Sequence, residues 1–294
     1  MRVLITGATG KIGKKLLDTL LVDEQNEIYA LLTEKDDSEL PPEIKICRGD
    51  LSELYSLRNA LSNINTVNTV LHMAAITHSN NKKEYFSINL EGTKNLVKIC
   101  EELGIKRIVF ISSRAACSGG GDYAESKLAA ENVIKKSKLE WLILALGEVY
   151  SISGNDEINR LFKTIKKNYF IPIIGNGEYK LAPVYIEDVV PAIMEAVNNE
   201  NLSSKRYIIC GKEEFSYREL VVAMVNFISV KRLIFNIPLL LLKFIFFLAH
   251  VIKIRRISYD QLNRLMVAKP SDISESIKDL GFNPRKFLEV LKLF

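Results

Sequence analysis

The sequence predicts an α/β fold: a doubly wound parallel sheet with a smaller, mainly helical C-terminal lobe. Short apolar runs alternate with segments of helical periodicity through the first half of the chain. These runs are continuously apolar, which indicates strands buried on both faces, as in a parallel sheet between two helical layers. The alternation loosens after about residue 150. We therefore expect one unit over residues 1–150, to which a segment at about 180–200 returns, and a lobe formed mainly by 151–294.

The expected elements follow this order along the chain. Strands are predicted at residues 3–5, 28–32, 44–47, 67–73, 108–111 and 141–146, and helices at 12–21, 51–61, 85–103 and 123–136. Gly104 is the expected C-cap of the long helix, because glycine adopts the left-handed conformation at little cost. Later segments predict a turn at 175–177, strands at 183–186 and 206–210, a helix at 187–198, and a helix capped by Ser216.

The composition is that of a folded chain with a sizeable core. Apolar residues make up 48% and charged residues 26% of the 294 residues. The four cysteines form no CxxC pair, so we expect reduced thiols rather than a disulfide framework or a zinc site. The opening MRVLITGATG runs straight into a predicted strand and turn, so we expect no signal peptide. We therefore expect a cytoplasmic protein, with membrane association left open.

Positive charge is concentrated at the C-terminal end. Residues 1–204 hold 24 Lys/Arg and 27 Asp/Glu, whereas residues 205–294 hold 16 and 8, a local surplus of +8. A solvated basic face, attraction to a phosphorylated substrate and attraction to an anionic membrane all explain this surplus. No basic stripe is interleaved with aromatic residues, so we expect no nucleic-acid partner.

Residues 233–254 form a very apolar segment. Polar or helix-breaking residues interrupt it at Asn236, Pro238, Lys243 and His250. A helix packed on the lobe is the favoured interpretation, and a peripheral membrane contact, an oligomer interface or a membrane span are the alternatives. Spanning needs roughly 20 apolar residues, and a central lysine costs about 2.5–3.5 kcal/mol on insertion scales. Cations at both ends of the segment would instead suit an interfacial helix.

The run TGATGKIG at residues 6–13 follows a predicted strand and opens a predicted helix. Gly7 permits the tight turn, Gly10 lets the backbone approach a pyrophosphate, and Gly13 lets the helix pack on the strand. The free N–H groups at the start of the helix then bind the anion. The run predicts a Rossmann-type dinucleotide-binding domain. The expected coenzyme contacts are Gly7, Thr9, Gly10, Lys11, Ile12 and Gly13.

These motifs together resemble the extended short-chain dehydrogenase/reductases, the NAD-dependent epimerase/dehydratase family. The run at residues 6–13 is similar to that family's TGxxGxxG turn, and GDL at 49–51, HMAA at 72–75, NLEGT at 89–93 and PVYIEDV at 183–189 are similar to later family motifs. The LGFNPR sequence near the C-terminus resembles the ending common among sugar-nucleotide epimerases and dehydratases. The resemblance implies further coenzyme contacts from Asp50, Leu51, Ala74, Ala75 and Asn89.

The choice between NAD and NADP stays open. An acidic residue at the end of the second strand binds the ribose hydroxyls of NAD, and a basic one accepts the 2′-phosphate of NADP. Leu32 and Thr33 stand at these two positions, and the neighbouring Glu34 and Lys35 favour opposite coenzymes. Thr33 is the expected contact in this region.

A Y-x-x-x-K motif opens the helix predicted at 123–136. The spacing puts Tyr123 and Lys127 on one helix face, where the ammonium favours the phenolate that exchanges a proton with a reacting hydroxyl or carbonyl. The resemblance gives Lys127 a second role in holding the nicotinamide ribose. It also implies a Ser or Thr that binds the substrate oxygen. Counting along the preceding strand selects Ser113, counting back from the glycine run selects Arg114, and we choose Ser113, with Ser112 structural.

Three departures from the family pattern affect the substrate side. Ser113 and Tyr123 are ten positions apart, closer than in many extended members, which shortens one wall of the site. Ala145 and Leu146 stand where the family has Arg and Pro. We expect the site to lack one fixed cation at the sheet edge as a result.

The leading hypothesis is an NAD(P)-dependent oxidoreductase or epimerase acting on a nucleotide sugar or similar alcohol, with Tyr123, Lys127 and Ser113 as catalytic residues. One alternative is a nucleotide-binding accessory protein of a membrane complex, like the dehydrogenase-like subunit of respiratory complex I. Another is a hydroxysteroid- or flavonol-type reductase. The resemblance implies a homodimer through the helices at 85–103 and 123–136. No metal site is expected, because His72 suits a packed strand and Glu187-Asp188 suit a helix start.

Overall fold

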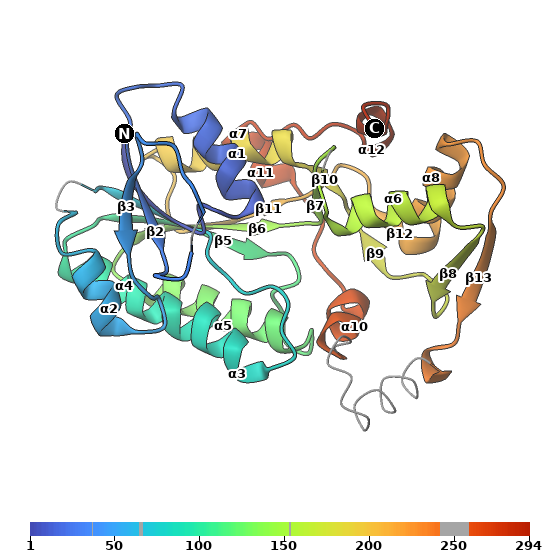
Figure 1. Ribbon diagram of the computed structural model, residues 1–294, viewed down its shortest axis with the longest axis horizontal. Helices are drawn as coiled ribbons and strands as arrows, with labels where there is room; N and C mark the ends of the chain where they lie inside the picture. Colours follow the sequence, from blue (N-terminus) through green and yellow to red (C-terminus); the bar gives the residue numbers. More distant parts are fainter. Residues whose placement is uncertain (37, 65–66, 153, 242–258) are drawn as a thin grey trace.

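The computed structural model describes residues 1–36, 38–64, 67–152, 154–241 and 259–294 (Figure 1). The main sheet contains β1 (Arg2–Thr6), β2 (Glu27–Leu32), β3 (Lys45–Arg48), β4 (Thr69–His72), β5 (Arg107–Ser113), β6 (Glu140–Leu146) and β11 (Lys205–Ile209). Its flanking helices are α1 (Lys11–Leu20), α2 (Leu54–Ala60), α3 (Lys82–Tyr85), η1 (Phe86–Glu91), α4 (Gly92–Glu102), α5 (Asp122–Lys136), α7 (Ile186–Asn198) and α11 (Ser274–Leu280).

The main sheet is parallel throughout, with the strand order β11-β6-β5-β4-β1-β2-β3. The chain starts in the middle at β1, winds outward to β3, and then returns to wind the other way from β4. This confirms the predicted doubly wound sheet. The direction of winding reverses between β1 and β4, and the crevice at their carboxyl ends is where such sheets bind ligands.

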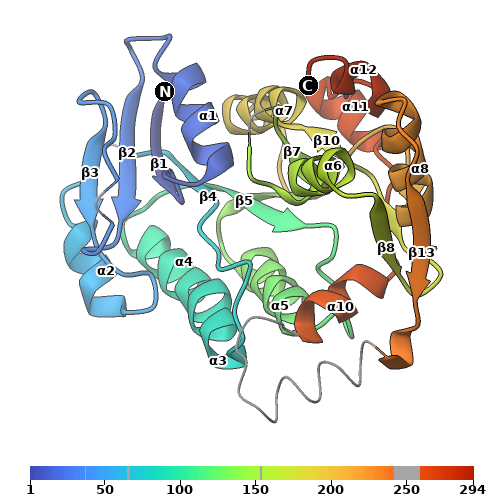
Figure 2. The same cartoon turned by 45° about the vertical axis from the view of Figure 1, so that its right-hand side comes forward.

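Two helical layers bury the sheet, as the continuous apolar strands predict. Helices α1, α7 and α11 cover one face, and α2, α4 and α5 cover the other (Figures 1 and 2). One apolar core therefore lies on each side of the sheet, and the core on the first side continues into the lobe.

The helix predicted at 85–103 is three consecutive segments. It begins as α3, passes through the π-helical turn η1 and continues as α4. Gly104 ends it with a φ of +71°, and the Ile105 N–H donates to Cys100 O at 2.9 Å, which confirms the predicted cap. Since π-turns inside helices often mark functional positions, η1 is a place to look for site residues.

The lobe lies beyond the carboxyl edge of the sheet (Figure 1). Its elements are β7 (Val149–Tyr150), α6 (Glu157–Lys167), β8 (Phe170–Ile174), β9 (Lys180–Leu181), β10 (Val184–Tyr185), β12 (Phe215–Ser216), α8 (Tyr217–Phe227), β13 (Leu233–Ile237), α10 (Tyr259–Met266) and α12 (Phe287–Leu291). Ser216 caps α8 as predicted, with its hydroxyl accepting from the Glu219 N–H.

Two segments differ from the sequence interpretation. β11 pairs in parallel with β6 and so extends the main sheet, although the sequence places it in the lobe. Residues 233–237 are the strand β13, paired with β8, rather than the start of a helix. Short apolar runs suit a helix or a strand equally well, so the partner strand decides between them. Residues 242–254 of the predicted apolar segment lie outside the described residues.

No helix within the described ranges has the length and apolar character needed to cross a membrane.

Candidate active site

The glycine-rich turn forms a tight cradle at the carboxyl end of β1. Gly7 has a φ of +77°, and a Cβ there would lie 2.7 Å from Ala74 N on the neighbouring strand end. A Cβ on Gly13 would lie 2.4 Å from Ala8 O, so only glycine lets α1 pack this closely. Gly10 is the N-cap of α1, and its own N–H donates to Gly7 O at 3.1 Å. The following N–H groups at the helix start are left for an anion.

An acidic side chain that the sequence did not single out reaches this cradle. Thr9 Oγ1 donates to Asp36 Oδ2 at 3.0 Å. Hydrogen bonds from Ser38 hold the pKa of Asp36 below its ordinary value, against a smaller opposing effect of burial. The predicted contact Thr33 lies exposed beside them, with its carbonyl accepting from Arg48 Nη1 at 2.9 Å. A fixed negative charge therefore stands next to the turn.

A buried chain of hydrogen bonds joins the ends of β1 and β4 to η1. Thr93 Oγ1 donates to Asn89 O at 2.6 Å, so it must accept from His72 Nε2, which lies 2.9 Å away. His72 Nδ1 then accepts from Thr6 Oγ1 at 2.7 Å, and that hydroxyl in turn accepts from Ala74 N–H at 3.1 Å. Burial, with a smaller effect of nearby Lys127, lowers the pKa of His72 to about 3 and keeps it neutral. His72 is a packed strand residue, as predicted.

Asn89 extends this chain to the helix that carries the tyrosine. Its Oδ1 accepts from Ile76 N–H at 2.8 Å, and its Nδ2 donates to Ile76 O and to Ser126 Oγ. Ser126 Oγ then donates to Tyr123 O at 2.8 Å. Asn89 is buried and both of its amide protons are used within the protein, so it links η1 to the helix of Tyr123, and its contact with the coenzyme stays a prediction.

Lys127 is buried below the carboxyl end of β5. Its Nζ donates to Ile111 O at 2.7 Å and lies 4.0 Å from the centroid of the Phe110 ring. Burial, only partly opposed by Glu131, lowers the pKa of Lys127 to about 7. A lysine that titrates near neutrality is typical of functional sites.

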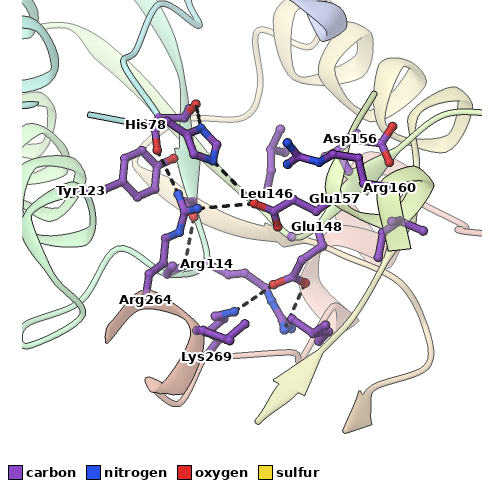
Figure 3. A pocket seen from close by; sticks show the side chains of 18 of the residues that line it. His78, Arg114, Tyr123, Leu146, Glu148, Asp156, Glu157, Arg160, Arg264 and Lys269 are labelled. Carbon is purple, nitrogen blue, oxygen red and sulfur yellow. Dashed lines mark hydrogen bonds and ion pairs between the residues drawn. The ribbon is translucent and has the colours of Figure 1, made fainter. Parts of the chain in front are cut away.

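A cavity of about 620 Å³ opens between the sheet edge and the lobe (Figure 3). Ser113 and Tyr123 both line it, so the structure brings two of the three predicted catalytic residues to one cavity. The Tyr123 ring contacts Tyr85 edge-on at 6.0 Å, and the Arg264 guanidinium carbon lies 4.9 Å from its centroid. Ser112 points elsewhere and donates to buried Glu131 at 2.7 Å, which gives it a structural position.

Lys11 joins the glycine-rich turn to the rim of the cavity. It is the first residue of α1, and its Nζ donates to Asp156 Oδ2 at 2.6 Å and to Val149 O at 3.4 Å. Asp156 and Val149 both line the cavity. The expected pyrophosphate site and the cavity are therefore adjacent, which is the arrangement that hydride transfer between coenzyme and substrate requires.

A cluster of charges forms the floor of the cavity. Arg114 is only 1% exposed, and its Nη2 lies 3.5 Å from Glu148 Oε2. Lys269 Nζ donates to Glu148 Oε1 at 3.0 Å. Burial raises the pKa of Glu148, but Lys269 and Arg114 outweigh it and hold the value below its ordinary range. Glu148 is therefore an ionised carboxylate shared by two buried cations.

The NAD dependent epimerase/dehydratase family matches residues 3–210. The chain belongs to this family. Membership confirms the resemblance drawn from the sequence motifs, and with it the enzyme class and the NAD(P) coenzyme.

Two curated relatives illustrate the range of the family. The 3-beta-hydroxysteroid dehydrogenase of Mycolicibacterium neoaurum is 25% identical over 229 residues, which cover 67% of this chain and 61% of that protein. The N-acetyl-alpha-D-glucosaminyl-diphospho-ditrans,octacis-undecaprenol 4-epimerase of Escherichia coli O157:H7 is 24% identical over 251 residues, which cover 78% of this chain and 73% of that protein.

The fold also matches a solved structure over nearly its whole length. The crystal structure of the Bordetella bronchiseptica enzyme WbmG in complex with NAD and UDP is similar with a TM-score of 0.76. The match covers 99% of this chain and 93% of that one at 17% identity. At this level of identity the likeness shows the shared fold.

The remaining family positions follow the carboxyl ends of β3 and β4. Ala74 and Ala75 follow shortly after β4, and Ala74 lies directly beside Gly7. Asp50 is exposed after β3, where its carboxylate accepts from the Ser52 N–H at 2.8 Å. Leu51 packs its side chain in the apolar core on the α2 and α4 side of the sheet, and its contact with the coenzyme stays a prediction.

The substrate side of this epimerase/dehydratase differs from the sequence expectation in one respect. The family's Arg is absent at Ala145, yet the sheet edge does hold a fixed cation. Arg114 supplies it from the neighbouring strand, where its N–H donates to Leu146 O at 2.9 Å. The sequence offered Arg114 only as an alternative to Ser113 for binding the substrate oxygen. The structure places both residues in the lining of the cavity.

Several residues that line the cavity were not predicted from the sequence, and all of them except His78 belong to the lobe. They are His78, Asp156, Glu157, Arg160, Arg264 and Lys269. Asp156 carries a signal that could have found it, because it stands before a segment of helical periodicity and caps α6. Lys269 carries none, since it comes from a segment without regular structure and reaches the cavity only through the tertiary fold.

Proposed function

We propose that this chain is an NAD-dependent epimerase or oxidoreductase that acts on a hydroxyl group of a nucleotide sugar. The observation that carries the proposal is the shared cavity of Ser113 and Tyr123 beside the glycine-rich turn. The nicotinamide supplies the hydride chemistry when it is bound. Tyr123 takes the proton of the reacting hydroxyl and returns it, and Ser113 binds the same oxygen.

The cavity walls support a diphosphate-bearing substrate. Arg114, Arg160, Arg264 and Lys269 line the cavity against three carboxylates, from Glu148, Asp156 and Glu157. Lys11 also engages Asp156 from outside the lining set, at 2.6 Å. The balance of charge around the cavity is therefore positive, which favours an anionic substrate group. The structurally similar WbmG enzyme was crystallised in complex with NAD and UDP, which supports the same class of ligands.

Asp36 supports NAD as the coenzyme. Its carboxylate is fixed to Thr9 of the turn and stays ionised, so it would repel the 2′-phosphate of NADP. We expect NADH to bind at least tenfold more tightly than NADPH in a fluorescence titration. Asp36→Asn should reduce the difference in affinity between NADH and NADPH. Equal affinities in the unsubstituted protein would contradict this preference.

The central test is turnover by Tyr123→Phe. The protein is first denatured and any released nucleotide identified by mass spectrometry, and a panel of UDP-sugars is then followed by proton NMR for the epimer or the ketone. Removing the phenol should reduce turnover about 10²–10⁴-fold, the usual contribution of a positioned acid or base. Tyr55→Phe, at an exposed tyrosine of α2, is the matched control. Full turnover by Tyr123→Phe would overturn the proposal.

A second candidate is an alcohol dehydrogenase for apolar, sterol-like substrates. Leu146, Val149, Ile158, Ile174 and Leu181 give one wall of the cavity an apolar character. The hydroxysteroid dehydrogenase among the relatives supports this option. Coenzyme reduction with apolar secondary alcohols and none with UDP-sugars would select it.

The homodimer through the helices at 85–103 and 123–136 stays a prediction.

A further inference from the structure

The strands β8 and β13 lie side by side as a small parallel sheet (Figure 2), and the residues on its outer face are apolar. Phe170 pairs with Leu233 and Pro172 with Phe235, and paired residues of a parallel ladder point to the same side. Phe170 is 60%, Leu233 47% and Phe235 40% exposed, and Pro172 is also exposed. The alternate residues of β8 are buried against the lobe. We call these four exposed residues the outer face.

Further exposed apolar residues lie near the outer face. Tyr169 precedes β8, and its ring lies edge-on against Phe170 at 5.2 Å. At the other end of β8, a Cβ on Gly175 would lie 3.2 Å from Leu239, which brings the chain after β13 back to this sheet. Leu240 next to it is 82% exposed. Single exposed apolar residues are ordinary on a protein surface, but a contiguous group marks an interaction site.

Cations border the outer face, and carboxylates are absent from the segments that build it. Residues 158–177 and 220–241 contain no Asp or Glu. Lys166 and Lys167 end α6 just before Tyr169, and both are exposed. Lys231 and Arg232 lead into β13, and Arg232 Nη2 donates to Lys166 O at 3.0 Å, so the two basic pairs lie together. We call these four residues the basic rim.

We propose that the outer face and the basic rim dock this protein on the surface of a bilayer containing anionic lipids. Aromatic and aliphatic side chains enter the boundary between head groups and acyl chains, while lysine and arginine meet the anionic head groups. A twofold contact between two copies would use the same surface on both, and so would bring two basic rims of like charge together. The charge pattern therefore favours a lipid surface over a second copy of the chain.

The docking surface leads directly to the cavity. Ile174, the last residue of β8, lines the cavity that holds Ser113 and Tyr123. A five-residue strand extends about 17 Å, so a docked bilayer would lie within that distance of the site. A substrate carried by a lipid anchor could then enter from the membrane. The docking itself does not depend on the proposed reaction, so either can fail alone.

The test is co-sedimentation of the full chain with lipid vesicles. We expect binding to vesicles of phosphatidylcholine mixed with phosphatidylglycerol, weaker binding as salt increases, and little binding to phosphatidylcholine alone. Phe170→Ser combined with Phe235→Ser should reduce binding at least tenfold. Tyr55→Ser combined with Val22→Ser is the matched control, because both residues are exposed apolar side chains of the other unit.

The basic rim is tested in the same assay. Lys166→Gln and Lys167→Gln should each weaken binding to the anionic vesicles about fivefold. Lys98→Gln and Lys106→Gln, at exposed lysines of the other unit, should leave it unchanged. Thermal melting followed by circular dichroism verifies that every variant is folded.

Three results would overturn the docking proposal. One is no binding by the unsubstituted chain to the anionic vesicles. Another is binding that the variants of the outer face and of the basic rim leave unchanged, because a different surface is then responsible. The last is sedimentation equilibrium that shows a dimer, which Phe170→Ser combined with Phe235→Ser converts to a monomer without loss of vesicle binding. That result would make the face a contact between copies.

Discussion

Two polar clusters lie at the carboxyl edge of the sheet, and they differ in how completely their hydrogen bonds are made. In the first, which runs from Ala74 through Thr6, His72 and Thr93 to Asn89, each donor has an acceptor along one directed chain. In the second, Arg114 has both Nε and Nη2 buried without a hydrogen-bond partner among the described residues.

This difference in hydrogen bonding suggests different roles: the first cluster is a rigid scaffold, and the second is a surface that can adapt to a ligand. A fully satisfied buried network fixes one geometry, and a partly satisfied one does not. The first cluster holds the glycine-rich turn and the Tyr123 helix, whose positions must be the same in every turnover. The second forms the cavity floor, where Arg114 lies 3.5 Å from Glu148 and 3.6 Å from Glu214. We infer that substrate selection is concentrated in the second cluster.

Lys127→Met tests how much the burial of this lysine reduces the free energy of unfolding, and we expect it to have the largest effect. Below pH 7 Lys127 is charged in both the folded and unfolded chain, and the fold bears the full cost of burying that charge. Between about pH 7 and 10.5 only the unfolded chain keeps the proton, so the free energy of unfolding rises with pH. The stabilisation by Lys127→Met should thus reach up to about 5 kcal/mol below pH 7 and vanish towards pH 10.5.

Urea unfolding at several pH values, with no added coenzyme, measures this. Lys98→Met, at an exposed lysine of α4, is the control and should show no such pH dependence. Turnover should be lost in Lys127→Met while stability increases. A stabilisation that is the same at pH 6 and pH 10 would mean that Lys127 is not buried as a charge.

Glu148→Gln, in the second cluster, should lower the free energy of unfolding of the protein by about 3 kcal/mol. It leaves Arg114 and Lys269 buried without their shared carboxylate, and removing one partner of a buried ion pair strands the other charge. The pKa of Glu148 is below its ordinary value of 4.5, so its contribution is present above that pH and is lost on acidification. The difference in the free energy of unfolding between the unsubstituted protein and Glu148→Gln should therefore become smaller at acidic pH.

The control for Glu148→Gln is a second substitution in the same protein. Lys269→Met added to Glu148→Gln removes one stranded cation and should restore part of the stability. If the double variant is less stable than Glu148→Gln alone, stranded charge is not the cause of the loss.

Thr93→Val, in the first cluster, should lower the free energy of unfolding of the protein by about 1–3 kcal/mol. The shape is kept, but the hydrogen bond to Asn89 O is lost and His72 Nε2 is left buried without an acceptor. Thr19→Val, at an exposed threonine of α1, should change stability by no more than about 0.5 kcal/mol. Equal effects of the two substitutions in urea unfolding would show that the directed chain contributes little.

The sequence predicted the first cluster's surroundings far better than the second's. Buried parallel strands and the turn at residues 6–13 can be recognised from a short stretch of sequence. Such strands require apolar runs and the turn requires glycines, independently of the rest of the chain. Asp36 escaped notice since it stands four positions past the end of β2 and reaches Thr9 only through the loop. Asn89 was found from its motif, but its hydrogen bonds to Ile76 and Ser126 were not, because a motif does not show where an amide points.

The lobe was predicted poorly for a related reason. Its strands are short, and β8 finds its partner β13 about sixty positions later, so the pairing leaves no local pattern. The same apolar residues of 233–237 suit either a helix or a strand. Lys269 likewise approaches Glu148 from 121 positions away.

Arg114→Met should have the smallest effect on stability and still change selection. It removes a buried cation with unmade hydrogen bonds, while Glu148 keeps Lys269 at 3.0 Å and the Ala182 N–H at 3.0 Å as partners. Glu148 therefore keeps two partners and Glu214 is partly exposed to water, so no carboxylate is left buried without compensation, and we expect a change within about 1 kcal/mol. The ranking of UDP-sugars by kcat/KM should nevertheless change, with the coenzyme affinity unaltered. A loss of several kcal/mol would instead place Arg114 in the scaffold and remove the distinction between the two clusters.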